Sequence, residues 1–502
     1  MIEYRINKLG VELEPKKQKA QQHTLLAKLL LARIFLCSAL MVFSPAALLF
    51  LYVDVGIGVA NASEQKSKTD NTEQRKYENI KTRKRQAVGK ACAKKLESAQ
   101  EILSGEKASG VKGGGEKGPS AQQLKNLVKQ LRGYLLNSCS ASYEKSQVYN
   151  LLGFVQYSLN APQKAVINYK AMIAEPDVDP RQKIDTHYTL AQLYMMQENY
   201  PFAARQLEKW MAGSDVVTAD GKVLLAQVYY ELERKDEALV LVNQAIDAVE
   251  VKGAIPKENW WLLQKILYYE KSGDKNYNYK KVVATLKKLI THYPKHIYWH
   301  QLGGMYGQME ENSHRLASLD ILYLDKALTK SRDLLSLAYL YLGADVPYKA
   351  AQIIEQGIDQ NIIESSAKNL ELLGSAWQQA RETEKALEPL KQAAEKSDTG
   401  KTWARLAMVY LDLDENTQAV KAARNALKKG QLKYPSYTQM TLGNALVNLN
   451  CYRDAAEVFG KAANNKKSQK TAKQWKTYVL GEADRRDSLI EGGAKIEDCQ
   501  LP

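Results

Sequence analysis

Two histidines come closest to a chemical site in this 502-residue chain. His292 and His296 stand four residues apart, and on one helix that spacing could bring both imidazoles to a single metal ion. Pro294 lies between them and ends the predicted helix, and no third ligand is evident. No serine lies in a nucleophile elbow, and no Cys–His pair suggests a thiol protease. We therefore predict no catalytic residue, no metal, no cofactor and no enzymatic activity.

A glycine-rich stretch at residues 104–120 is the second feature that could carry chemistry, because glycine runs can cradle phosphate. This one lacks the Gly-Lys-Ser/Thr ending of a phosphate loop, and no strand precedes it. The stretch is therefore interpreted as a flexible loop between two helices.

The cysteines point to an oxidising compartment. Cys37 lies in an apolar leader, and an even number remains after it: Cys92, Cys139, Cys451 and Cys499. Four cysteines allow three pairings, of which the local one joins Cys92 to Cys139 and Cys451 to Cys499. Such bonds would secure both ends of the fold, and four unlinked thiols remain the alternative.

A pattern that recurs about every 35 residues dominates the rest of the chain. A Leu-Gly or Leu-Ala pair is followed by an aromatic residue, and an alanine comes nine residues later, as in Tyr194 and Ala203. The clearest pairs are Leu190-Ala191, Leu225-Ala226, Leu337-Ala338, Leu373-Gly374, Leu406-Ala407 and Leu442-Gly443. This is the signature of tetratricopeptide repeats, in which small residues let two antiparallel helices cross closely.

The spacing of the second small residue gives the number of repeats. It falls at 165, 203, 238, 282 (here Val), 317, 350, 386, 419 and 455, which makes nine copies. No single helix pair can bury both of its faces, so the pairs must stack. The sequence predicts an all-α, right-handed solenoid of about nine repeats with terminal capping helices.

The predicted organisation has five parts. They are a leader (1–62), a disordered tether (63–75), an N-terminal helical region (76–145), the repeat array (146–465), and a capping helix with its tail (466–502). In the N-terminal helical region and the last part, which flank the array, helices are expected at about 76–103, 121–138 and 469–490.

The leader predicts export. Residues 34–53 carry no charge and follow several lysines, and Ala60-Asn61-Ala62 resembles a cleavage site. Two interpretations stay open: a signal peptide cut after Ala62, which we favour, or an uncleaved membrane anchor. Both place the array outside the cytoplasm, in the periplasm of a Gram-negative bacterium.

The formal charge of +15 raises the question of nucleic-acid binding. Basic residues are spread along predicted helix faces and mixed with acidic ones, so solvated surfaces are the favoured explanation. We predict no nucleic-acid partner. The run at residues 81–85 leaves attraction to anionic lipid as a minor alternative, and membrane association through the N-terminus stays possible.

Protein contacts are expected on the inward face of the first helix of each repeat. The repeat phase places eight side chains there: Tyr188, Gln192, Gln227, Tyr230, Trp261, Tyr339, Gln378 and Asn444. Of the adjacent Trp260 and Trp261, one is expected in the core and one is a candidate exposed anchor, although burial of both stays open.

Several stretches resemble a narrower family. They are 194–200, 256–261, 302–306, 346–351 and 367–373. They are similar to the TtpC-like periplasmic tetratricopeptide-repeat accessory proteins of TonB–ExbB–ExbD energy-transducing systems, over about residues 145–490. The resemblance implies a non-enzymatic scaffold that binds TonB, ExbB or ExbD and supports energy-dependent uptake of iron carriers across the outer membrane. The long basic leader, the glycine-rich loop and Cys92 depart from that family.

Two other functions remain in view. One is a tetratricopeptide adaptor for outer-membrane protein assembly or polysaccharide export. The other is an enzyme hidden behind the repeats, but residues 63–145 are too short and too polar to hold a catalytic domain.

Overall fold

The computed structural model describes residues 87–104, 118–496, 499 and 501. The predicted leader and tether, and most of the glycine-rich loop, lie outside these residues, so those predictions stay as they are. In the described part of the chain, none of the helices combines the length and the apolar run that crossing a bilayer requires. The candidate span at residues 34–53 is not among these helices.

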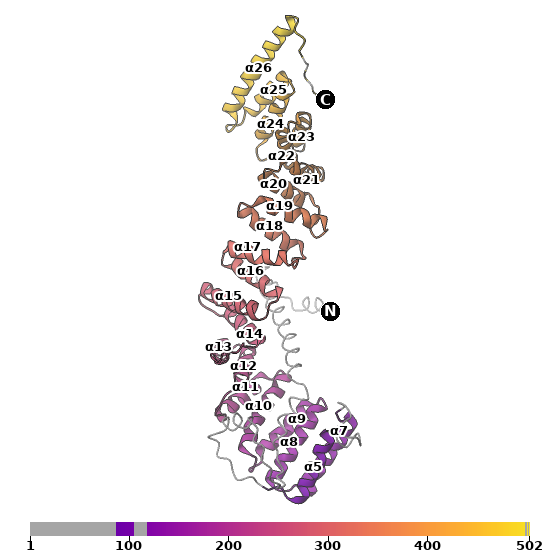
Figure 1. The fold of residues 1–502 in the computed structure, drawn as a ribbon, viewed down its shortest axis with the longest axis vertical. Helices are drawn as coiled ribbons and strands as arrows, with labels where there is room; N and C mark the ends of the chain where they lie inside the picture. Colours follow the sequence, from indigo (N-terminus) through magenta and orange to yellow (C-terminus); the bar gives the residue numbers. More distant parts are fainter. Residues whose placement is uncertain (1–86, 105–117, 497–498, 500, 502) are drawn as a thin grey trace, which may run out of the picture. The chain divides into compact units, whose positions relative to one another are not determined.

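The described residues form helices and no strands, as the all-α prediction requires. Two helices come first: α5 (Lys90–Ser104) and α7 (Ala121–Asn137). Nine helix pairs follow in chain order (Figure 1): α8 (Ser142–Ser158) with α9 (Pro162–Ala174), α10 (Pro180–Met196) with α11 (Tyr200–Gly213), α12 (Ala219–Glu231) with α13 (Lys235–Glu250), α14 (Glu258–Glu270) with α15 (Lys275–His292), α16 (His296–Gln308) with α17 (Asn312–Leu324), α18 (Ser331–Gly343) with α19 (Pro347–Asp359), α20 (Ala367–Gln379) with α21 (Thr383–Lys396), α22 (Gly400–Asp412) with α23 (Asn416–Lys429), and α24 (Pro435–Asn448) with α25 (Tyr452–Ala462). The last helix is α26 (Gln469–Glu491).

Small residues set the distance between the two helices of a pair. A Cβ atom added to Gly374 would lie 2.4 Å from Leu390 Cγ, and one added to Gly443 would lie 2.5 Å from a ring carbon of Phe459. Neither distance is possible between real atoms, so the sequence needs glycine where these helices cross. The predicted crossing alanines of four other pairs are fully buried: Ala203, Ala238, Ala350 and Ala419.

A repeated turn joins the helices within most pairs. The second residue after the first helix adopts the left-handed backbone conformation, with φ between 54° and 62°. The second helix begins two residues later. These residues are Asn160, Glu198, Glu233, Glu310, Asp345, Arg381, Asp414 and Asn450. A left-handed residue after the last turn is a common way to end a helix. The same turn at equivalent positions gives most pairs the same geometry.

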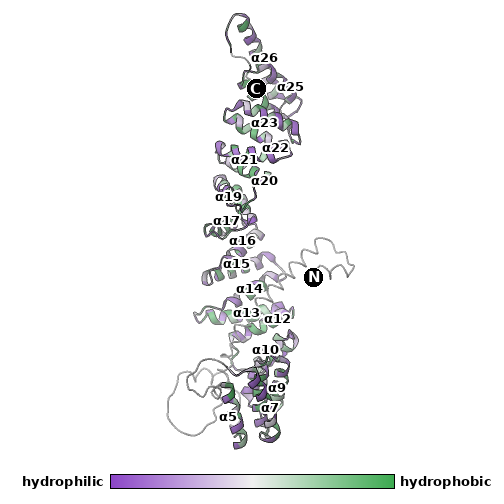
Figure 2. Ribbon diagram, turned by 90° about the vertical axis from the view of Figure 1, so that its right-hand side faces the viewer, coloured by the Kyte–Doolittle hydropathy of each residue, from purple (hydrophilic) through white to green (hydrophobic). Residues whose placement is uncertain are grey.

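Each helix packs against its neighbours along the chain, and buried residues from α17 to α26 form one continuous apolar core. Apolar and polar residues occur together along the repeat helices in Figure 2, as expected for helices that bury one side.

In the fifth repeat the crossing residue is Ser318, which is buried, whereas Ala317 is exposed. The prediction of Ala317 was therefore wrong by one residue. Ser318 lies against Gly303, which has no side chain, so a serine fits there.

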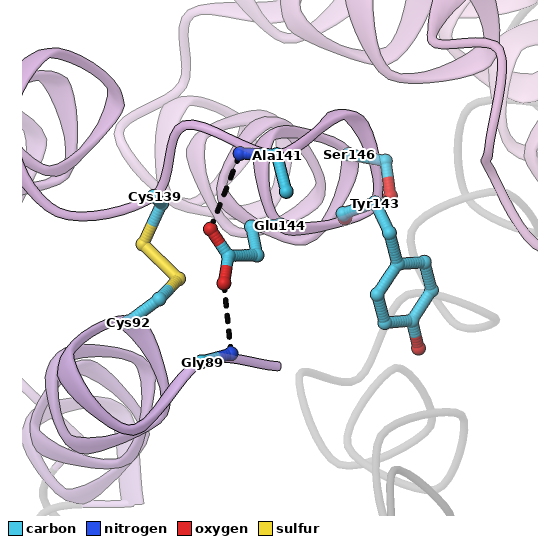
Figure 3. The surroundings of a disulfide bond; sticks show 7 residues. All are labelled: Gly89, Cys92, Cys139, Ala141, Tyr143, Glu144 and Ser146. Atoms are coloured by element: carbon cyan, nitrogen blue, oxygen red, sulfur yellow. Dashed lines mark hydrogen bonds between the residues drawn. A yellow bond between two sulfur atoms is a disulfide. The ribbon is translucent and has the colours of Figure 1, made fainter. Parts of the chain in front are cut away.

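Disulfides hold both ends of the described chain, and they join Cys92 to Cys139 and Cys451 to Cys499. These are the local pairings among the three that the sequence allows. Beside the first bond, Glu144 accepts hydrogen bonds from the backbone amides of Gly89, at 2.8 Å, and Ala141, at 3.3 Å (Figure 3). This carboxylate therefore fixes the start of α8 and the residue that precedes α5.

Candidate protein-binding surface

The first helices of the repeats present equivalent positions to one surface. Gln192, Gln227, Tyr339 and Asn444 each follow the small residue at which their helix crosses its partner. Successive residues of a helix are turned by about 100°, so these four side chains point away from the crossing. We call the surface that they mark the first-helix face. Tyr339 is 51% exposed, and the other three are half-buried.

Asn444 on this face and Tyr188 beside it differ in whether their polar atoms have partners and in how they are packed. Asn444 Oδ1 is buried and has no hydrogen-bond donor among the described residues. Tyr188 is half-buried one turn before Gln192, and its ring packs against Trp210 with centroids 5.0 Å apart. Burial, with a smaller contribution from the charge of Asp220, raises the pKa of Tyr188 to about 12, so it stays neutral. Gln378 is also half-buried, near the end of α20.

Trp261 is not an exposed anchor, and that prediction was wrong. Both tryptophans of α14 are buried, Trp260 to 4% exposure and Trp261 to 1%. The Trp261 ring stacks on His292 at 5.3 Å between centroids and meets the edge of Tyr293 at 5.9 Å. The end of α15 therefore covers the tryptophan that would have had to reach a partner.

Tyr230 is also largely unavailable, because it is 8% exposed. Its hydroxyl donates to Glu270 Oε1 at 3.2 Å, and Lys235 pairs with the same carboxylate at 3.0 Å. Burial and the Glu270 charge raise the pKa of Tyr230. This residue links α12 to α14 instead of offering its hydroxyl to a partner.

Lys265 is a feature of the surface that sequence reasoning missed. It is half-buried on α14, and its Nζ donates to Gln301 Oε1 of the next first helix, α16, at 2.7 Å. Burial lowers its pKa to about 8. No carboxylate among the described residues lies within salt-bridge distance of this ammonium, so it is a cation with a neutral partner only. The sequence could have indicated this partly buried lysine, because Lys265 lies in a helix rich in tryptophan and leucine.

The histidines do not form a metal site in the described part of the chain. His292 stacks on Trp261, whereas His296 Nε2 lies 3.4 Å from Asp325, the residue that follows α17. Cys451, Asp454 and Cys499 bring three ligand-type atoms together, but both sulfurs belong to a disulfide. A disulfide sulfur is not the thiolate that binds metals.

Comparisons with known proteins add fold-level likeness only. No protein-family model matches the chain, and no curated protein does either. Among solved structures, a tetratricopeptide repeat protein from Parabacteroides merdae is 15% identical, covering 57% of this chain and 99% of its own, with a TM-score of 0.33. The TPR2AB domain of yeast Sti1 is 14% identical, covering 56% and 98%, with a TM-score of 0.29. MamA is 18% identical, covering 35% and 94%, also with a TM-score of 0.29.

The class of the protein follows from the helix pairs themselves. Nine consecutive pairs in the described residues, most of them crossing at small residues and joined by the same turn, define an all-α solenoid of tetratricopeptide type.

Proposed function

We propose that this protein is a non-enzymatic scaffold whose first-helix face holds another protein. The observation that carries the proposal is the recurrence of polar or aromatic side chains at one position of four first helices: Gln192, Gln227, Tyr339 and Asn444. Repeat solenoids use such extended surfaces for binding. Tyr339 supplies an exposed aromatic side chain there, a residue type enriched at interfaces.

The finer proposal is that the partner belongs to a TonB–ExbB–ExbD complex in the periplasm, where the scaffold supports energy-dependent uptake of iron carriers. The five stretches that resemble TtpC-like proteins and the predicted export leader support this assignment. The Cys92–Cys139 and Cys451–Cys499 disulfides are consistent with an oxidising compartment.

In-cell crosslinking tests both levels of the proposal. The full-length chain with a C-terminal tag is crosslinked in its own host, and the captured proteins are identified by mass spectrometry. We expect TonB, ExbB or ExbD, with reduced capture by the double variant Gln192→Ala/Asn444→Ala. The matched control is Gln163→Ala/Asn425→Ala, which removes the same two amides from exposed second-helix positions.

Each outcome separates the alternatives. Recovery of outer-membrane assembly or export components without those three proteins would replace the TonB assignment with the adaptor function. Equal loss of capture in the test and control variants would refute the first-helix face as the binding surface.

A further inference from the structure

An open hollow lies beside the first-helix face, where the last repeat meets the terminal helix. A pocket of about 350 Å³ is lined by Val447 of α24 and by Gln474, Trp475 and Tyr478 of α26. Its wall is therefore mainly apolar, with one carboxamide. The Trp475 ring stacks on Phe459 of α25, with the two ring centroids 5.8 Å apart. The Tyr478 ring meets the Trp475 edge at 5.7 Å.

The α24 side of this pocket continues the first-helix face. Tyr437, Met440, Asn444 and Val447 follow one another at spacings of three, four and three residues. That spacing puts them in one stripe along α24. Tyr437 is 52% exposed and Tyr478 is 53% exposed, so two aromatic rings are accessible along the stripe and the pocket.

Lysines lie at the other end of the stripe. The ammonium groups of Lys433 and Lys467 lie 5.4 and 4.6 Å from the centre of the Tyr434 ring. That ring packs edge-on against Tyr437 at 5.7 Å. Lys470 is exposed and stands four residues before the pocket residue Gln474, which places it on the same side of α26.

This positive charge is not neutralised within the described residues. No carboxylate there pairs with Lys433, Lys467 or Lys470. Two acidic residues of the adjoining helices are engaged elsewhere: Glu457 pairs with Lys461, and Glu482 pairs with Arg485. The surface thus combines unpaired cations with an apolar pocket.

We infer that this surface, defined as Lys433, Lys467, Lys470, Tyr437, Val447, Gln474, Trp475 and Tyr478, binds an acidic peptide segment of a partner protein that carries a bulky apolar side chain. The carboxylates lie by the lysines, and the apolar side chain fills the pocket. Charge complementarity selects the acidic partner and the pocket selects the apolar side chain. The inference rests on the proposed scaffold function and assigns it a place and a partner chemistry.

Fluorescence anisotropy with the full-length chain in detergent micelles tests the inference. The probes are three labelled peptides of about twelve residues: one acidic with a central phenylalanine, one acidic with serine there, and one basic with phenylalanine. We expect the first to bind about tenfold or more tightly than the other two, with affinity that falls as salt rises.

Variants locate the binding. Lys467→Glu/Lys470→Glu and Tyr478→Ser should each weaken the acidic phenylalanine peptide by about tenfold. The control Lys391→Glu/Lys421→Glu makes the same change in net charge at exposed positions of the second helices α21 and α23. It should leave affinity within about twofold, because exposed charges act weakly at a distance. Circular dichroism of each variant verifies folding.

Three results would overturn the inference: equal affinity for the acidic and basic peptides, equal loss in the control variant, or tighter binding of a single-stranded oligonucleotide of equal charge. If the peptide does not bind but in-cell capture still depends on Gln192 and Asn444, only this inference fails. If capture also fails to depend on them, the proposed scaffold surface fails as well.

Discussion

The buried ammonium of Lys265 should make the protein less stable at neutral pH than it would be with an apolar residue there. Burial lowers its pKa from 10.5 to about 8, and each pKa unit corresponds to about 1.4 kcal/mol. The charged form in the folded state therefore costs up to about 3 kcal/mol. Replacing it with methionine leaves Gln301 Oε1 without its donor, which costs about 1 kcal/mol. We expect Lys265→Met to raise the free energy of unfolding by about 2 kcal/mol at pH 7.

The lowered pKa of Lys265 also predicts how the stability difference between Lys265→Met and the native chain changes with pH. Below pH 8 the lysine is protonated in both the folded and the unfolded state, so the full penalty applies. Between pH 8 and the unfolded value near 10.5, the unfolded state holds more protons, so the stability of the native protein rises with pH. The advantage of Lys265→Met should shrink across this window and be absent above it.

Urea unfolding followed by tryptophan fluorescence, at several pH values from 7 to about 10.5, measures the effect. Trp260 and Trp261 lie on the same helix as Lys265 and report on its unfolding. Lys287→Met, at an exposed position of α15, is the control and should change little. A constant difference between Lys265→Met and the native chain at all pH values, or no difference at pH 7, would show that Lys265 is not desolvated.

Three further stability predictions concern the ends and the crossings. Removing the first disulfide with Cys92→Ala/Cys139→Ala should lower the free energy of unfolding by up to about 4 kcal/mol, because the bond closes a long loop. Hydrogen exchange should rise in α5 and α7, and unchanged exchange in these helices would contradict the prediction. Glu144→Gln, which weakens two hydrogen bonds to backbone amides, should raise exchange in the same segment by an amount equivalent to about 1–2 kcal/mol. Gly443→Ala places a Cβ against Phe459 and should lower the free energy of unfolding by about 1–3 kcal/mol in urea; a neutral result would mean that α24 and α25 separate without strain.

The repeated fold was predictable because its physical requirement is local and periodic. Two helices cross closely only where the contact residues are small, so Gly374 and Gly443 reveal the register without any knowledge of distant parts. The exception shows the limit of that reasoning. Ala317 and Ser318 are both small neighbours, and only the position of α17 against Gly303 decides that Ser318 is the one that crosses.

The surface was harder to predict, because the exposure of a side chain depends on residues far along the chain that pack over it. Trp261 has the residue type of an interface anchor, yet His292 and Tyr293, about thirty residues later, cover it. Tyr230 is likewise bonded to Glu270 of the following repeat. A pattern that identifies the first helix of a repeat cannot tell what the second helix or the next repeat places over it.

Lys265 and the lysines beside Tyr434 show what the net charge of a sequence cannot predict. The formal charge of +15 says that cations are in excess, but not which of them lack a partner. Lys235 and Lys271 have carboxylates from neighbouring segments, whereas Lys265 has only an amide oxygen. An unpaired cation beside apolar side chains is where a partner's carboxylate gains most, because water screens the pair least there. The specificity of a repeat scaffold therefore resides in positions that the repeat pattern leaves unconstrained, and substitutions there should change the partner without changing the fold.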